Sequence, residues 1–337
     1  MLKRSKRKTN TRQSEDSWPR PVSTAINMLM SAIARVHLVL IGFVVLLGAY
    51  VWGTWPTSAE SEVNALASPY CIERGQAEAS ILATASYVKD MTTGDVVFEK
   101  NPDAQLPLAS LTKVMTVLVA GDMLVPDDRV TVTAEALLPE GSSVGLNEVW
   151  KAADLMDYTL ISSANDGAEA LALAAAKKHG DTKEGFIARM NNKAATLGLT
   201  QTYFSNTTGL DLSESSSGAY GSARDAANLI AYAVAEHPEL FEGTTSERTT
   251  FTALSGEVHE AKNTSGLIWN LAGAVASKTG FTDLAGGNLV IVFEPVLGRP
   301  IAASVMGSSR EGRDEDMAQL AAAAKRWVTR DILCDGE

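Results

Sequence analysis

The amino-acid sequence predicts an α/β fold in which a mainly antiparallel sheet is flanked by a helical region and preceded by one N-terminal transmembrane helix. Two runs of strand-forming residues surround Thr93-Gly94-Asp95, a pattern typical of a β-hairpin. The middle of the domain, about 150–240, is rich in alanine and leucine and favours helices. The chain then returns to strands. This order favours one mainly antiparallel sheet whose first and last strands are far apart in sequence.

The first 55 residues differ in composition from the rest of the chain. Residues 1–35 contain eight basic and two acidic side chains, whereas the remainder contains 21 basic and 38 acidic ones. Residues 36–55 contain no Asp, Glu, Lys or Arg and are long enough to span a bilayer. Trp52 and Trp55 lie where interfacial aromatic residues are expected. We therefore expect a cytoplasmic tail and an uncleaved single-pass membrane anchor. A cleaved signal peptide is the alternative.

The rest of the chain divides into a polar linker at 56–75 and one α/β domain at 76–337. A basic tail joined to an acidic domain indicates a topology signal, and nucleic acid is not an expected partner. The anchor places this domain in the periplasm or the extracellular wall space, outside the cytoplasmic membrane. In an oxidising compartment Cys71 and Cys334 form a possible disulfide, with two unpaired thiols as the alternative.

Local signals predict the element boundaries within the domain. One helix is predicted to open at Ser110, directly after the hairpin, and another at Ser222, with Asp225 in its first turn. Strands are predicted at 276–278, in "GNLVIVFE" and in "PIAASVMG", with a turn at "PVLGR". A final helix is predicted at about 314–330.

The stretch "LPLASLTKVMT" at 106–116 contains a candidate catalytic pair, Ser110 and Lys113. Residues three apart on a helix share one face. A serine is a poor nucleophile at neutral pH unless a neighbour takes its proton, and burial lowers the pKa of a lysine toward neutrality. The alternative is a helix cap followed by a solvated lysine. Ser-x-x-Lys has little specificity, since Ser5 and Lys8 also match it.

Two further motifs follow in order. Ser163-Ala164-Asn165 lies between helical segments, and its alternative interpretation is a helix-terminus turn. Lys278-Thr279-Gly280 lies at a predicted strand, and its alternative is the end of a surface strand. The three motifs in this order and local context match the set Ser-x-x-Lys, Ser-x-Asn and Lys-Thr-Gly of penicillin-binding proteins and class A β-lactamases.

On these motifs and on non-catalytic stretches such as "DMTTGDVVFEKN", "FSNTTGLD" and "KTGFTDLAGGNLV", the domain resembles the low-molecular-weight penicillin-binding proteins, the serine D-alanyl-D-alanine carboxypeptidases and their endopeptidase relatives. The likeness runs from about Ala77 to Trp327. It implies a hydrolase that removes the terminal D-Ala from peptidoglycan pentapeptide stems through an acyl-serine intermediate. It also implies inhibition by penicillin and other β-lactam antibiotics, and no metal or organic cofactor.

The resemblance assigns catalytic roles that acyl-transfer chemistry also requires. Ser110 attacks the D-Ala-D-Ala carbonyl, and Lys113 is its base. Ser163 relays a proton to the leaving amine. Asn165 positions Lys113 and hydrogen-bonds the substrate.

The resemblance also assigns substrate-binding roles. Lys278 and Thr279 bind the terminal carboxylate through charge-assisted hydrogen bonds. Gly280 lets the strand backbone approach an extended substrate, which adds along the strand edge. The backbone N–H groups of Ser110 and Phe281 form the oxyanion hole.

Several alternatives stay open or are disfavoured at this point. A DD-endopeptidase that cleaves cross-links has the same catalytic set, and a non-catalytic cell-wall-binding scaffold is the non-enzymatic alternative. A class A β-lactamase is disfavoured because the chain has no Glu-x-x-Leu-Asn pattern. "GSSVG" at 141–145 matches a nucleophile elbow at Ser143 but lacks the flanking strand and helix. The four histidines form no spaced metal pair.

Overall fold

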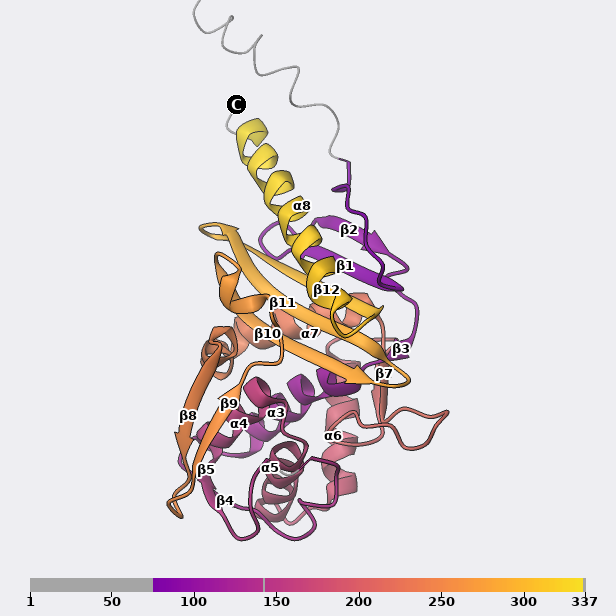
Figure 1. Ribbon diagram of the computed structural model, residues 1–337. Coiled ribbons are helices and arrows are strands. Elements are labelled where there is room, and N and C mark those ends of the chain that lie inside the picture. The colour runs from indigo at the N-terminus through magenta and orange to yellow at the C-terminus, as the bar shows by residue number, and fades with distance from the viewer. Residues whose placement is uncertain (1–74, 142, 336–337) are drawn as a thin grey trace, which may run out of the picture. The chain divides into compact units, whose positions relative to one another are not determined.

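Strands from the two ends of the domain form one five-stranded antiparallel sheet in the order β10-β11-β12-β1-β2 (Figure 1). The computed structural model describes residues 75–141 and 143–335, and the side chains as far as residue 330. β1 (Ala85–Asp90) lies between β2 (Val96–Lys100) and β12 (Arg299–Ser308). The predicted hairpin and the predicted pairing of early with late strands in one sheet are both confirmed.

The turn between β1 and β2 is held by a buried carboxylate. Asp90 accepts hydrogen bonds from the backbone N–H groups of Thr92 and Thr93 and from the guanidinium of Arg299. Gly94 has a φ of 82°, which glycine adopts without strain. The local geometry of the turn thus favours these residues in the hairpin, and Arg299 connects the turn to β12.

The late strands and the final helix occur where they were predicted. β10 (Ala274–Thr282), β11 (Gly286–Val296) and β12 are consecutive antiparallel neighbours, and α8 (Gly312–Asp335) follows them. α8 packs on β11 and β12, and α7 (Ala223–Glu236) packs on β1, β11 and β12 (Figure 1). The apolar run in β11 is continuous because both of its faces are buried. Ile291 and Phe293 belong to the core that includes α8, and Val290 and Val292 to the core that includes α7.

The middle of the chain is helical, as predicted. It contains α3 (Thr112–Met123), α4 (Ala152–Ser162), α5 (Asn165–Lys178) and α6 (Lys183–Thr196). α3 is buried along nearly its whole length and contacts the other three helices and α7. α7 begins after Ser222, whose Oγ accepts the backbone N–H of Asp225 at 3.1 Å. That predicted helix start is confirmed.

Several short elements connect these parts and were not predicted from the sequence. Within the described residues they form the small sheets β3-β7-β6, β4-β5 and β8-β9 and four 3₁₀ helices. The strands are β3 (Leu106–Pro107), β4 (Arg129–Thr131), β5 (Val149–Lys151), β6 (Tyr203–Phe204), β7 (Ala219–Gly221), β8 (Arg248–Thr252) and β9 (Val258–Lys262), and the 3₁₀ helices are η1 (Ala109–Leu111), η2 (Pro238–Leu240), η3 (Glu242–Thr245) and η4 (Ile268–Asn270).

The N-terminal predictions concern residues outside the described part of the chain. The anchor at 36–55, nearly all of the linker, and Cys71 are not among the described residues, and the side chain of Cys334 is not described either. None of the helices within 75–141 and 143–335 combines the length and apolar composition that crossing a bilayer requires. The anchor, the domain bounds and the disulfide therefore stay predictions.

Candidate active site

Ser110 lies in the 3₁₀ turn η1, and α3 begins at Thr112. The predicted helix start at Ser110 is therefore wrong by two residues, because the chain makes a tighter turn first. Ala109 has a φ of 49°, a left-handed conformation that costs energy for a residue with a side chain and that clusters at functional sites. Lys113 is the second residue of α3, and its side chain still reaches Ser110.

Lys113 is the central donor of the site. Its Nζ atom lies 2.8 Å from Ser110 Oγ, 2.7 Å from Asn165 Oδ1 and 2.8 Å from the carbonyl oxygen of Thr208. The side chain is 0% exposed, so the alternative of a solvated lysine is wrong. Burial lowers the pKa of Lys113 to about 7, while the carboxylate of Asp166 acts in the opposite direction. At neutral pH a large share of Lys113 is unprotonated and is able to accept the Ser110 proton.

Ser163 and Asn165 occupy the turn between two helices. Ser163 caps the C-terminus of α4 with a φ of 62°, and Asn165 is the first residue of α5. Asn165 accepts from Lys113 and donates its Nδ2 to the carbonyl oxygen of Glu140 at 2.6 Å. Ser163 Oγ accepts from Lys278 Nζ at 2.9 Å. The motif is thus both a helix-terminus turn and a connection between two lysines.

Lys278 is a second buried lysine, on β10. Its Nζ also donates to the carbonyl oxygen of Thr279 at 2.8 Å. Burial holds the pKa of Lys278 well below its usual value, and the charges of Lys113 and Arg313 lower it further. Lys278 is 1% exposed, so this motif is not the end of a surface strand.

Gly280 lets β10 pass close to the turn that contains Ser110. A Cβ atom on Gly280 would lie 2.8 Å from the carbonyl oxygen of Leu108 and 3.2 Å from the backbone nitrogen of Ser110. β10 is the edge strand of the sheet next to β11, and η1 contacts it. An extended peptide that adds along this edge passes Ser110.

Phe281 follows Gly280 on β10 and pairs with Gly287 of β11. The guanidinium of Arg310 lies 3.9 Å from the centroid of the Phe281 ring, a cation–π contact. The oxyanion-hole roles of the Ser110 and Phe281 N–H groups stay predictions.

Arg313, which sequence reasoning missed, supports the same strand. It lies at the start of α8, is largely buried, and donates to the carbonyl oxygens of Gly280 at 2.9 Å and Thr264 at 2.8 Å. The hydroxyl groups of Thr264 and Thr279 also contact each other. No local sequence pattern indicates that a single arginine at the start of a helix contacts a residue 33 positions earlier in the chain.

Asn288, also missed, holds the segment before Ser110. Its fully buried side chain donates to the carbonyl oxygens of Pro107 at 2.9 Å and Leu108 at 3.1 Å, and accepts the N–H of Gly307 at 2.9 Å. One amide thus connects the segment before Ser110 to β11 and β12.

Replacing Asn288 with alanine is expected to lower the free energy of unfolding by about 2–4 kcal/mol, because two carbonyl groups and one N–H group lose their partner inside the core. Urea unfolding followed by circular dichroism measures the loss. Asn192 on α6 is exposed, so Asn192→Ala serves as the control. Equal stability of Asn288→Ala and Asn192→Ala would contradict the assigned role of Asn288.

The structure also shows the surroundings of residues whose nucleophilic or metal-binding roles the sequence disfavoured. Ser143 lies in a loop with neither a strand before it nor a helix directly after it, and its backbone N–H donates to Asp166. It therefore does not occupy a nucleophile elbow. Among residues 75–141 and 143–330, no three His, Cys, Asp or Glu side chains gather in a way that could hold a metal ion.

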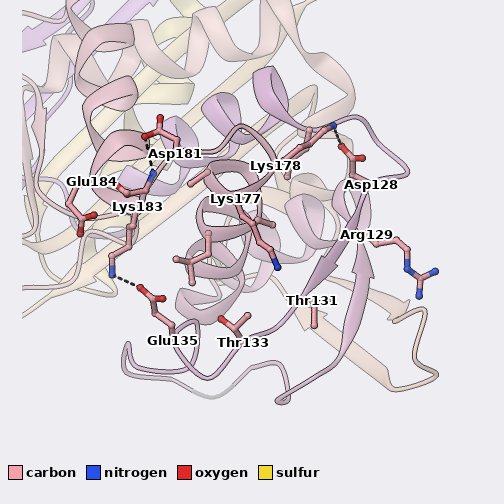
Figure 2. A pocket seen from close by; sticks show the side chains of 15 residues that line it. Asp128, Arg129, Thr131, Thr133, Glu135, Lys177, Lys178, Asp181, Lys183 and Glu184 are labelled. Carbon is pink, nitrogen blue, oxygen red and sulfur yellow. Dashed lines mark hydrogen bonds and ion pairs between the residues drawn. The ribbon is translucent and has the colours of Figure 1, made fainter.

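A groove of about 760 Å³ lies along β4 and the C-terminal end of α5 (Figure 2). Charged side chains line it, and several pair with one another: Lys178 with Asp128, and Lys183 with Glu135 at 3.7 Å. None of the eight predicted site residues lines this groove. It is separate from the cluster around Ser110.

A family model described as D-alanyl-D-alanine carboxypeptidase matches residues 73–310. The chain belongs to this family. The matched range includes all eight residues predicted for the site.

Some relatives are named carboxypeptidases and others endopeptidases. The chain is 33% identical over 216 residues to a D-alanyl-D-alanine endopeptidase of Pseudomonas aeruginosa, covering 61% of this chain and 66% of the relative. It is 35% identical over 225 residues to D-alanyl-D-alanine carboxypeptidase DacC of Escherichia coli, covering 63% of this chain and 53% of the relative. The aligned part thus spans between half and two thirds of these relatives.

A solved structure shares the fold of the domain. Penicillin-binding protein D2 from Listeria monocytogenes, in its ampicillin-bound form, superposes with a TM-score of 0.62 and 26% identity. The superposition covers 74% of this chain and 99% of that protein. The antiparallel sheet with its helical region is therefore the fold of penicillin-binding DD-peptidases.

Proposed function

We propose that the protein is a serine DD-peptidase that removes the terminal D-Ala from peptidoglycan pentapeptide stems. One observation carries the proposal: a fully buried lysine with a pKa of about 7 lies 2.8 Å from the hydroxyl of Ser110. Family membership supports the same chemistry. A second buried lysine at Ser163 supplies the proton path that a leaving amine needs.

The first half-reaction forms an acyl-enzyme. Ser110 Oγ attacks the carbonyl carbon of the penultimate D-Ala while Lys113 takes the hydroxyl proton. The N–H groups of Ser110 and Phe281 stabilise the oxyanion of the tetrahedral intermediate. The C–N bond then breaks, and the proton that Lys113 took passes through Ser163, which Lys278 holds in place, to the leaving D-Ala amine. Lys113 is then neutral again.

The second half-reaction releases the shortened stem. A water molecule attacks the ester on Ser110, and Lys113 again acts as the base. Ser110 recovers its proton when the C–O bond breaks. A β-lactam amide follows the first half-reaction in the same way and leaves an ester on Ser110, and the ampicillin-bound relative from Listeria monocytogenes supports this expectation.

The substrate carboxylate is expected beside Lys278 and Thr279, where its negative charge favours the protonated form of Lys278. Lys278 and Thr279, both on β10, are expected to contact the carboxylate. Arg313 supports the same strand through the carbonyl oxygen of Gly280. Charge-assisted hydrogen bonds to a carboxylate are stronger than neutral ones, so a free C-terminus is favoured at this position.

We also propose that residues 36–55 anchor the enzyme in the cytoplasmic membrane with residues 1–35 inside. The basic tail, the apolar segment and the acidic domain support this orientation. A domain held outside the membrane suits a polymeric wall substrate.

A DD-endopeptidase activity is the second candidate, because the Pseudomonas aeruginosa relative is named an endopeptidase. To separate the two, the purified full-length protein is incubated with monomeric pentapeptide and with cross-linked muropeptides, and products are followed by mass spectrometry. Loss of one D-alanine from the monomer supports the carboxypeptidase. Splitting of the cross-linked dimer alone supports the endopeptidase. No change in either substrate, with no β-lactam adduct, contradicts both and favours the cell-wall-binding scaffold.

A further inference from the structure

Glu169 is a buried carboxylate on α5 that the reaction described above does not use. It is 4% exposed. Its Oε1 accepts a hydrogen bond from Lys183 Nζ at 2.8 Å, and its Oε2 accepts the hydroxyl of Thr207. Glutamate is almost never fully buried unless it is paired. These two contacts therefore account for a charged side chain at this position.

Lys183 connects Glu169 to the charged groove. It is the first residue of α6, lines the groove, and lies 3.7 Å from Glu135 there (Figure 2). Its hydrogen bond to Glu169 raises the pKa of the Lys183 amine, so this amine is charged at neutral pH. Glu169 thus has a cationic partner on the groove side, and its second oxygen is directed at Thr207.

Thr207 belongs to the turn that provides an acceptor for Lys113. The carbonyl oxygen of Thr208 accepts from Lys113 Nζ at 2.8 Å, and the carbonyl oxygen of Thr207 accepts the hydroxyl of Thr116 at 2.6 Å. Both residues of the turn are buried. The turn is therefore bound to α3 through Lys113 and Thr116, and to α5 through Glu169.

These contacts form two layers along the helices. Lys113 and Thr116 are three residues apart on α3, and Asn165 and Glu169 are four apart on α5, so each pair shares one helix face. The first layer surrounds Lys113. The second lies about one helical turn further along each helix and holds Thr207 between Thr116 and Glu169.

The first layer orients the base. A neutral amine has two N–H bonds and one lone pair. When Lys113 donates to Asn165 Oδ1 at 2.7 Å and to the Thr208 carbonyl at 2.8 Å, its lone pair is left for the hydroxyl of Ser110, 2.8 Å away. A general base must point at the proton that it takes. The position of the Thr208 carbonyl therefore affects the rate at which Ser110 is deprotonated.

We propose that Glu169 is a positioning residue for Lys113, and that it acts through the hydroxyl of Thr207 on the carbonyl of Thr208. This inference rests on the proposed peptidase function and adds a residue to it. The negative charge of Glu169 strengthens the hydrogen bond from Thr207, and the ion pair with Lys183 holds the carboxylate in place.

The test measures acylation of the purified full-length protein by a chromogenic β-lactam. Stopped-flow traces at increasing β-lactam concentration separate the limiting acylation rate from the Kd of the non-covalent complex. Glu169→Met keeps the length of the side chain but cannot accept from Thr207, and is expected to lower the limiting rate about tenfold, since small displacements of a catalytic group are costly. The Kd is expected to stay unchanged, because Lys278 and Thr279 lie on β10 and not on this turn.

Three further variants assign the effect to one hydrogen bond. Thr207→Val removes the donor and is expected to lower the rate by the same factor. The double variant Glu169→Met with Thr207→Val is expected to be no slower than either single variant, because both remove the same bond. Glu169→Gln keeps an oxygen that accepts from Thr207 and is expected to stay within about threefold of the wild-type rate.

Glu135→Met is the matched control. Glu135 is exposed and contacts the same lysine as Glu169, so its replacement removes a charge beside Lys183 without affecting Thr207. The wild-type acylation rate is expected. A loss of folded protein in any variant reduces the amplitude of the acylation signal and leaves the limiting rate of the folded fraction unchanged.

The possible failures are distinguishable. If the wild-type protein is not acylated, the proposed function is contradicted. If the wild-type protein is acylated and Glu169→Met reacts at the same limiting rate, the role of Glu169 is overturned and the peptidase function is retained. Weaker β-lactam binding in place of slower acylation, a Glu169→Gln variant as slow as Glu169→Met, or effects that multiply in the double variant overturn it as well.

Discussion

Replacing Ser110 with alanine is expected to lower kcat for D-Ala release by on the order of 10⁴-fold or more, the usual cost of removing a catalytic nucleophile. The substitution removes the Oγ atom that lies 2.8 Å from Lys113, so no acyl-enzyme forms. Product release is followed by mass spectrometry of the peptide. The same instrument reads the intact protein after incubation with penicillin, where the wild-type protein gains one covalent adduct and Ser110→Ala gains none.

Ser143→Ala is the matched control for this loss. Ser143 lies in "GSSVG", which matches the sequence of a nucleophile elbow, and contacts Asp166 through its backbone. Its alanine variant is expected to keep both hydrolysis and the penicillin adduct. An adduct on Ser110→Ala, or its loss from Ser143→Ala, would show that the nucleophile is another residue.

The rate of acylation is expected to rise with pH through about 7 and to level off above it. The pKa of Lys113 is lowered from 10.5 to about 7 because the side chain is buried. Below this pKa the amine is protonated and cannot accept the Ser110 proton, and above it the neutral base predominates. Lys113→Met, which keeps the apolar stem, is expected to lower the acylation rate by roughly 10²–10⁴-fold and to remove the inflection near pH 7.

Stopped-flow acylation by a chromogenic β-lactam at several pH values measures this profile. Lys262 is exposed on β9, so Lys262→Met removes a lysine without touching the site and is expected to keep the wild-type profile. A loss of folded protein would reduce the amplitude of the acylation signal without changing the pH at which the rate profile inflects. An inflection near pH 7 that persists in Lys113→Met would mean that another group is the base.

Local patterns were sufficient to predict much of the fold. The hairpin before Ser110, the cap at Ser222 and the apolar run of β11 each depend on residues close in sequence, whose backbone preferences and periodicity are visible in the chain itself. The start of α3 was misplaced because the tight turn at Ala109, with its φ of 49°, is held by Asn288 through the carbonyl oxygen of Leu108, 180 residues away in sequence.

The candidate site likewise has one part that the sequence predicted and another that it did not. The eight predicted residues belong to three short motifs, and their resemblance to one family assigned them roles together. Arg313 and Asn288 could not be found by that route, because a single arginine or asparagine has no periodicity or spacing to mark it. Arg313 contacts Gly280, 33 positions away along the chain, and Asn288 contacts Pro107, 181 positions away.

The sequence by itself determined the order of the main strands and helices and the family, and it predicted the nucleophile and its neighbours. Only the tertiary structure decided how far Lys113 and Lys278 are buried, and that β10 is an edge strand lying next to Ser110. The reason is physical. The pKa of an amine depends on the solvent and charges that surround it, and residues 110, 163 and 278 share one environment only after the sheet and the helices pack together.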